Sequence, residues 1–230
     1  MAATKTPYEA FDIAKKFVKN MPLESVGPQI LDEINKRMWM AAPWRWTLGA
    51  LPPITPLVNV TDYNIALPNN FLYIYDAILA NAGKIVRHLE CIGEINPTVN
   101  QIGQISKIAH VTAGTFRVYP KPPQVDNPAS SILCRYKKVS PLVTNQSQST
   151  PGLLVMDDDW FWVYQHGVIW LSYLWGDDSR AGSATVDKNG QTQYSGQRAV
   201  FEDGLWQMRN REKLIPLDDR KAIDVEENNK

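Results

Sequence analysis

The stretch "DDDWFWVYQHGVIWLSYLW", residues 157–175, holds four of the chain's eight tryptophans. Its pattern predicts a helix that carries Trp160 and Tyr164 on one side and Trp162 and Ile169 on another. Apolar residues therefore nearly encircle this helix. Because a helix that is hydrophobic all round must be buried on every side, it needs cover from several directions. The chain's own core and another subunit both stay open as sources of that cover.

The residues at the two ends of this segment suit helix termini. Asp157, Asp158 and Asp159 precede the apolar run, where carboxylates accept from unpaired amide groups and oppose the helix dipole. Gly176 follows the run and suits the left-handed position just after a helix. We therefore interpret the acidic triplet as a helix cap and not as a metal site.

This tryptophan-rich helix is not expected to enter a membrane. A spanning helix needs about 20 apolar residues, and the run from Trp160 to Trp175 is shorter and contains Gln165, His166 and Ser172. An interfacial helix would need a basic polar face, whereas both ends here are acidic. No secretory signal is expected, because the first apolar residues of the chain come at helical spacing. The chain is therefore expected to be made in the cytoplasm.

Three further helices are predicted. The first ends at Pro22, and the second has Pro28 in its first turn and ends at Pro43. The last helix is expected to be capped by Ser195 and to end at Pro216. The residues that share a face at helical spacing are Tyr8, Phe11, Ala14, Val18 and Met21 in the first helix, Ile30, Leu31, Ile34 and Met38 in the second, and Phe201, Leu205, Met208 and Glu212 in the last.

The segment between the second helix and the tryptophan-rich helix is rich in proline and in short β-branched or aromatic runs. These runs have the length of strands and alternate with turn-forming sequence, which predicts an antiparallel sheet folded on itself as a small sandwich or barrel. The expected strands lie in "VNVTDYNIAL", "FLYIYDAIL", "KIVRHLECIGEI", "SKIAHVT", "TFRVY" and "SILCRYKKV". Farther along, "DSRAGSATVDKNGQTQYSG" is expected to be a long flexible connection with a turn at its "NG".

The expected fold class is α+β. Residues 1–43 and 150–214 are predicted to form one discontinuous four-helix bundle, and residues 44–149 a β-rich, sandwich-like or barrel-like domain inserted between the second and third helices. Residues 215–230 are charged and lack a periodic stripe, so they are predicted to form an extended C-terminal arm.

Composition and motifs argue against nucleic-acid binding, catalysis and metal binding. Lys plus Arg equals Asp plus Glu at 24 each, whereas a protein that grips nucleic acid usually carries an excess of Lys and Arg. Cys91 and Cys134 lie in strand-like segments and are expected to be reduced thiols in the core. The three histidines form no close pair, and the common nucleotide-binding and nucleophile motifs are missing from the sequence. We therefore expect no enzymatic activity, no cofactor and no metal.

The order of these features resembles the head–tail adaptor proteins of short-tailed bacteriophages, also described as head-completion or tail tubular protein A-like proteins. The resemblance covers most of the chain and rests on the order, the spacing and the residue composition of its segments. It is carried by "WRWT", "YNIALPNNFLYIYDA", "GTFRVYPKPP", "CRYKKVSPLVTNQS", the acidic-capped aromatic helix, and "DSRAGSATVDKNGQTQYSGQRAVFEDGLWQM".

The resemblance implies a virion structural protein at the head–tail junction. Such proteins form a homo-oligomeric ring, typically of about twelve copies, between the portal protein and the tail nozzle or tube protein. DNA passes through the channel of the ring, and the zero net charge of this chain fits a conduit that does not bind DNA specifically. The resemblance also implies a C-terminal segment that reaches toward the portal. The candidate portal-docking residues are Asp218, Asp219, Arg220, Lys221, Ile223 and Val225.

The tryptophan-rich helix is the candidate subunit interface, because Trp and Tyr are favoured anchors in such surfaces. The candidate interface residues are Trp160, Trp162, Trp170, Tyr173 and Trp175. Two alternatives stay open. One is a different neck or tail ring protein. The other is a β-sandwich module that binds carbohydrate by stacking sugars on Trp44, Trp46 or Tyr119.

Overall fold

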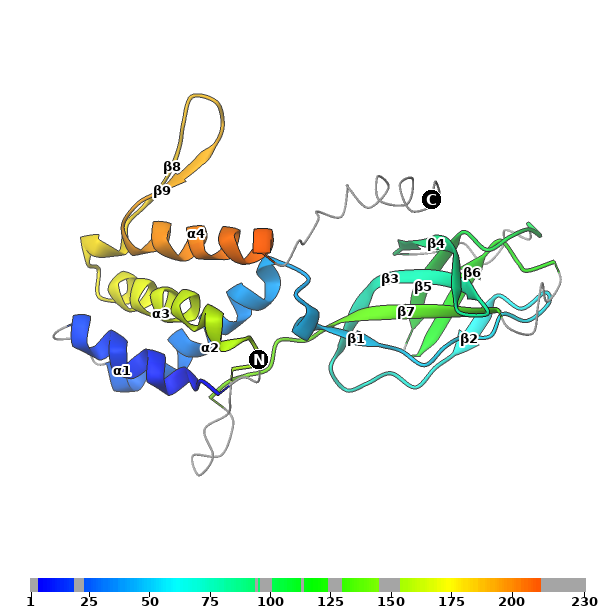
Figure 1. Cartoon of the computed structure of the whole chain (residues 1–230), viewed down its shortest axis with the longest axis horizontal. Helices are drawn as coiled ribbons and strands as arrows, with labels where there is room; N and C mark the ends of the chain where they lie inside the picture. The colour runs from blue at the N-terminus through cyan, green and yellow to red at the C-terminus, as the bar shows by residue number, and fades with distance from the viewer. Residues whose placement is uncertain are drawn as a thin grey trace. The chain divides into compact units, whose positions relative to one another are not determined.

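The computed structural model describes residues 4–18, 23–93, 95, 101–112, 114–123, 130–144 and 154–211. The chain divides into two compact units. The helical unit comprises Met1–Trp46 with Ser140–Lys230, and the β unit comprises Thr47–Val139. The elements of both are labelled in Figure 1.

The helical unit contains four α-helices among its described residues. They are α1 (Pro7–Phe17), α2 (Leu23–Ala41), α3 (Phe161–Trp175) and α4 (Gly196–Arg211). Short 3-10 turns lie at Arg45–Thr47 (η1, at the boundary of the units), Asp158–Trp160 (η2) and Ser179–Ala181 (η3). Two short strands, β8 (Ala184–Val186) and β9 (Thr192–Tyr194), form a hairpin between η3 and α4.

The four helices do not form the predicted bundle with an inserted domain. Instead α3 is central: α1, α2 and α4 each pack against it, and Figure 1 shows it between α4 and α1. The physical reason is the amino-acid sequence of α3 itself. In a four-helix bundle each helix has one apolar stripe and one wet face, whereas α3 buries nine of its fifteen residues. A helix that is apolar nearly all round becomes the core of its unit.

Two glycines let the helices approach α3 closely. A Cβ atom on Gly167 would lie 2.9 Å from the Ile34 methyl group of α2 and 2.9 Å from the Phe201 ring of α4. A Cβ atom on Gly204 would lie 2.9 Å from both methyl groups of Val163. Side chains of normal size at these two positions would force α2 and α4 away from α3.

The predicted apolar stripes are largely confirmed, except that Tyr8 of α1 is 38% exposed and lies off the core. Ile30, Leu31, Ile34 and Met38 of α2 are buried, as are Phe201, Leu205 and Met208 of α4. Met21 and Glu212 lie outside the described residues.

The helix ends differ from prediction. Pro28 was expected in the first turn of α2. It lies in the interior of the helix instead, because α2 begins at Leu23. Gly176 was expected to be left-handed, yet Asp177 takes that conformation, with φ of 50°. The Asp178 amide then donates to the Tyr173 carbonyl at 2.9 Å, which closes the end of α3.

The β unit is built on one seven-stranded sheet that curls into a half-barrel. Its strands follow the order β1-β7-β3-β4-β5-β6-β2 across the sheet. They are β1 (Leu48–Ala50), β2 (Asp62–Asn64), β3 (Phe71–Asn81), β4 (Lys84–Ile92), β5 (Lys107–Thr112), β6 (Thr115–Tyr119) and β7 (Ser130–Lys138). Its core comprises Leu51, Ile54, Tyr63, Ala77, Leu89, Ile105, Ile108, Phe116, Val118, Ile132, Cys134 and Tyr136.

The prediction of an antiparallel sandwich or barrel is therefore wrong. The sheet is mixed, because β4 and β5 run parallel, with Cys91 opposite Ile108. A parallel neighbour requires a crossover connection rather than a hairpin, and the sequence between β4 and β5 carries no regular stripe that would reveal one. The six strand-like runs do hold β2 to β7, and β1 was missed because only three residues pair with β7.

Candidate functional site

The five predicted interface residues differ in how much surface they keep. Trp160, Trp170 and Tyr173 are buried in the helical unit, with Trp170 only 2% exposed. Trp162 is partly buried against the same core. Trp175 is 53% exposed. Among these five, Trp175 and part of Trp162 are what a partner could reach.

Cationic side chains of the same unit cover the aromatic rings of α3. Arg211 lies over Trp160 at 5.1 Å, and Arg180 lies over Tyr173 at 4.4 Å. Arg37 and Arg198 both lie over Trp170, each at 5.2 Å. An arginine places its alkyl stem on apolar surface and its planar head over a ring face. The chain therefore supplies much of the cover that α3 needs.

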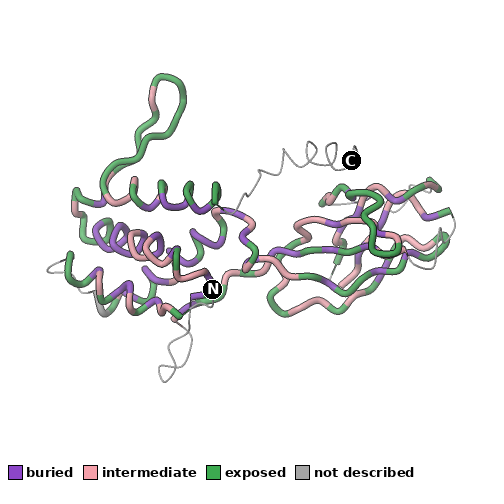
Figure 2. Tube along the Cα trace, in the orientation of Figure 1, coloured by how far each residue is buried: buried purple, intermediate pink, exposed green. Residues whose placement is uncertain are grey.

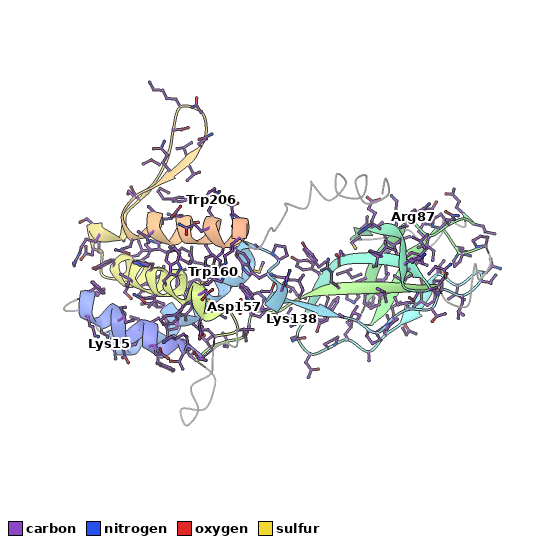
Figure 3. The ribbon with its side chains drawn as sticks, in the orientation of Figure 1. Lys15, Arg87, Lys138, Asp157, Trp160 and Trp206 are labelled. Atoms are coloured by element: carbon purple, nitrogen blue, oxygen red, sulfur yellow. The ribbon has the colours of Figure 1, made fainter. Side chains whose placement is uncertain are left out.

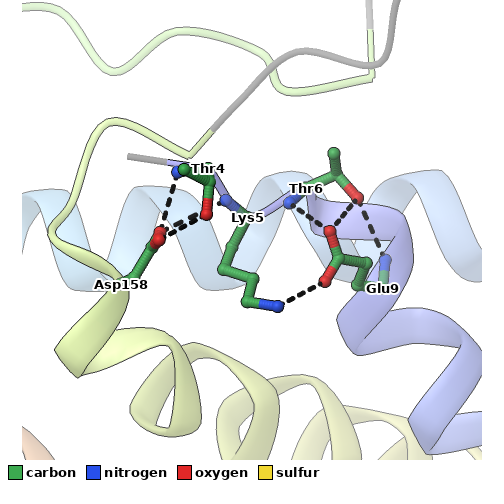
Figure 4. A network of polar contacts seen from close by, with 5 residues as sticks. All are labelled: Thr4, Lys5, Thr6, Glu9 and Asp158. Atoms are coloured by element: carbon green, nitrogen blue, oxygen red, sulfur yellow. Dashed lines mark hydrogen bonds and ion pairs between the residues drawn. The ribbon is translucent and has the colours of Figure 1, made fainter. Parts of the chain in front are cut away.

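The acidic triplet does not cap α3, and that interpretation is wrong. Asp158 lies in η2, one turn before α3, and accepts hydrogen bonds from the Thr4 amide (2.8 Å), the Lys5 amide (3.2 Å) and the Thr4 hydroxyl, as Figure 4 shows. The hydrogen bonds from Thr4 lower the pKa of Asp158. Asp159 pairs with Arg211 of α4 at 2.9 Å. The triplet thus fastens the start of α1 and the end of α4 to the beginning of α3.

The β8–β9 hairpin is the feature that stands out from the helical unit. The sequence between α3 and α4 was expected to be a flexible connection, but Ala184, Thr185 and Val186 pair with Tyr194, Gln193 and Thr192. Figure 1 shows the hairpin standing clear of the helices, and Figure 2 colours nearly all of it as exposed. The expected "NG" turn is confirmed at its tip, where Gly190 has φ of 78°. The missed signal was the short alternation on each side of that turn.

One face of the hairpin is mostly apolar: Val186 near its tip is uncovered, whereas the Tyr194 ring at its base lies under the Arg198 guanidinium at 4.8 Å. Side chains alternate across a strand, so Ala184, Val186 and Tyr194 share one face with Thr192, while Thr185 and Gln193 occupy the other. Val186 is 69% exposed. A two-stranded hairpin with no backing layer is at best marginally stable in water. The apolar face therefore lacks the partner layer that a strand pair normally has.

The root of the hairpin, by contrast, is tightly built. Gly182 and Gly196 lie against each other with φ of 83° and 58°, and a Cβ atom on Gly182 would lie 1.9 Å from the Ser195 carbonyl oxygen. The Ser183 amide donates to the Ser195 hydroxyl at 2.9 Å, and the Ser195 amide donates to the Ser183 carbonyl at 3.0 Å. Ser195 was predicted to cap α4 with its hydroxyl, but that hydroxyl accepts from the Ser183 amide at the hairpin root instead.

A clamp of charges ties this root to α3. Asp178 accepts from the Arg180 amide at 2.9 Å and from two guanidinium nitrogens of Arg180. These bonds lower the pKa of Asp178 to about 2. Arg180 is thereby held over the Tyr173 ring. The contacts of Arg180 with Asp178 and Tyr173 therefore hold the start of the hairpin against the end of α3.

The outer face of α4 carries a second exposed apolar group. The buried residues Phe201, Gly204, Leu205 and Met208 define the inner face, and Trp206 projects roughly 150° away from the centre of that face at 100° per residue. Trp206 is 59% exposed, and Figure 3 shows it on the outer side of α4. Tryptophan in this position costs solubility without adding to the core, which is typical of a contact surface.

Several other predicted residues do not form a site. The portal-docking candidates Asp218, Asp219, Arg220, Lys221, Ile223 and Val225 lie outside the described residues. Trp44 was a candidate sugar platform, but it is fully buried, donates to the Met38 carbonyl at 2.6 Å and stacks on Trp46 at 5.4 Å. Tyr119 is partly buried and hydrogen-bonded to Gln101.

The possible metal ligands and nucleophiles can be placed in the described part of the chain. Within it, His, Cys, Asp and Glu form no group of three or more that could hold a metal ion. Cys91 and Cys134 are free thiols, and burial raises their pKa to about 11 and about 12. A thiol needs a lowered pKa to act as a nucleophile at neutral pH. Across the same residues, the helices are too short or too polar to cross a membrane.

Comparison with known proteins adds no relative. Neither a scan against protein-family models nor a search of curated protein sequences finds a match to this chain.

Proposed function

We propose that this chain is the subunit of a head-to-tail adaptor ring in a short-tailed bacteriophage virion. It connects the portal protein to the tail nozzle or tube protein and lines part of the DNA channel without specific DNA binding. The observation that carries the proposal is the β8–β9 hairpin, which has a fixed root and exposes the apolar Val186 near its tip. A projecting arm of this kind suits a protein that works by contacting other subunits. The order and texture of the sequence, which resemble the adaptor proteins, support the same function.

The zero net charge is consistent with a conduit. Each Lys or Arg that neutralises a phosphate strengthens binding to DNA, and tight binding would oppose transit of the genome. A different neck or tail ring protein is the alternative within the same class, since such a ring would need the same kind of arm.

The test is negative-stain electron microscopy of the purified chain, alone and mixed with the portal protein of the same phage. We expect rings that sit coaxially on portal particles. Sedimentation of the mixture measures the stoichiometry, which should match the symmetry of the portal. A chain that stays monomeric and does not co-sediment with the portal contradicts the proposal.

A further inference from the structure

We infer that the β8–β9 hairpin of one copy docks on the outer face of α4 of the next copy, with Val186 packing against Trp206. This inference deepens the proposed function, because it rests on a ring and names the contact that closes it. Both surfaces belong to the helical unit, and Val186 and Trp206 are 69% and 59% exposed in the single chain.

The two surfaces match in size and chemistry. The hairpin offers Ala184 and the exposed Val186 on one face. The outer face of α4 offers Trp206, which is 59% exposed. Aromatic and aliphatic side chains of this kind form the small anchored clusters that carry most binding energy in protein interfaces. Exposed polar residues flank both groups: Lys188 and Asn189 lie beyond Val186, and Asp203 and Gln207 lie near Trp206. A polar rim of this kind is usual around a protein interface.

Charge supports the same pairing. Lys188 lies two residues beyond Val186 at the exposed tip of the hairpin, and Asp203 lies on α4 one turn before Trp206. Both side chains are exposed. A tip that reaches Trp206 brings Lys188 within range of Asp203, which favours one register and one partner.

The two surfaces lie apart within one chain (Figure 1). The hairpin joins the start of α4 at Gly196, where its root is locked, and leaves the helices there (Figure 1). Trp206 lies ten residues farther along the same helix, about 15 Å away at 1.5 Å per residue. The hairpin of a chain therefore does not lie on its own Trp206. A contact between two different surfaces repeats head to tail, and such contacts close into rings when the rotation allows.

The experiment pairs surface variants with cross-linking. Val186→Asp and Trp206→Ala should each weaken self-association by about 30-fold or more, the effect of truncating a tryptophan anchor. The matched controls are Thr185→Asp, on the polar face of the same strand, and Val200→Ala, an exposed position of the same helix about 120° round from Trp206. Both controls should change the association constant by no more than a few-fold. Sedimentation velocity measures association, and circular dichroism checks that each variant is folded.

Cross-linking identifies the contact itself. In a Cys91→Ser background, a Val186→Cys chain is mixed with a Trp206→Cys chain and oxidised, both in solution and bound to portal particles. A disulfide between the two chains is expected, and Thr185→Cys with Trp206→Cys should give none. Rings that form normally with the Val186 and Trp206 variants overturn the inference but leave the adaptor function standing. A chain that binds portal without the 186–206 disulfide also overturns it, and a chain that neither self-associates nor binds portal overturns both.

Discussion

Lys137 allows the energetics of the β unit to be tested through pH. It lies on β7, is 2% exposed, and its Nζ atom donates to the Thr47 hydroxyl at 2.7 Å. Burial penalises the charged ammonium and lowers the pKa of Lys137 from 10.5 to about 8. In the unfolded chain the same side chain regains its ordinary pKa. The folded β unit therefore binds fewer protons than the unfolded one between about pH 8 and pH 10.5.

The sign follows from that difference. Below pH 8 the lysine is charged in both states, and the folded state bears the full cost of burying the charge. As the pH rises through 8, the folded protein releases the proton while the unfolded chain keeps it, so the free energy of unfolding increases. With 1.36 kcal/mol for each pKa unit, the 2.5-unit difference is worth about 3 kcal/mol in total. About 2 kcal/mol of that gain falls between pH 7 and pH 9.5.

The assay compares the natural chain with Lys137→Met in urea at pH 7, 8.3 and 9.5. Far-UV circular dichroism at strand wavelengths follows the β unit. Tryptophan fluorescence follows the helical unit, which holds all eight tryptophans. The stability of the natural chain relative to Lys137→Met should rise by about 2 kcal/mol over this range. Lys84→Met, an exposed lysine of the same unit, is the control and should show no such trend. A difference that stays flat with pH would refute the lowered pKa.

Three other outcomes are expected in the two units. Trp170→Ala should cost about 3–5 kcal/mol of folding free energy in thermal or urea unfolding, because Trp170 is buried and stacks on Phe201 at 5.6 Å; Trp175→Ala should cost little, and equal losses would contradict the burial pattern. Gly204→Ala should destabilise by about 1–3 kcal/mol, since its methyl group would meet Val163; a neutral result would show that α4 can shift freely. Cys91 and Cys134 should react slowly with a thiol reagent at pH 8, because their raised pKa values of about 11 and 12 leave almost no thiolate, and rapid labelling of the folded chain would count against that.

The sequence predicted the elements that carry strong local patterns. The stripe of Ile30, Leu31, Ile34 and Met38 is buried as expected, because helical spacing of apolar residues depends only on which face is wet. Strands β2 to β7 lie in the predicted runs, because short β-branched and aromatic runs bounded by turn-forming residues are also a local pattern. The order and direction of the strands in the sheet could not be predicted in the same way. The parallel pairing of β4 with β5 depends on the path of a connection that has no pattern of its own.

The candidate site was predicted only in part, and for a physical reason. The hairpin has three residues in each strand, which is too short for alternation to be distinguished from an irregular polar loop. Its definition comes from Gly182 and Gly196, whose close approach across 14 positions of sequence is a tertiary fact. The acidic triplet misled for a related reason: the donors that Asp158 binds belong to Thr4 and Lys5, far away in the chain.

The tryptophan-rich helix shows why aromatic density alone does not identify an interface. Its rings were expected to need cover on every side, from the chain's own core or from another subunit. Arginines provide that cover, and Trp170 has one on each of two approaches from α2 and α4. Because guanidinium groups stack on aromatic faces while their outer edges stay hydrated, a ring can be removed from water without a second subunit. The surface left for assembly is therefore where no cation lies over the apolar groups that face solvent. In the helical unit those groups include Val186 on the hairpin and Trp206 on α4, and a ring contact is better sought there than along α3.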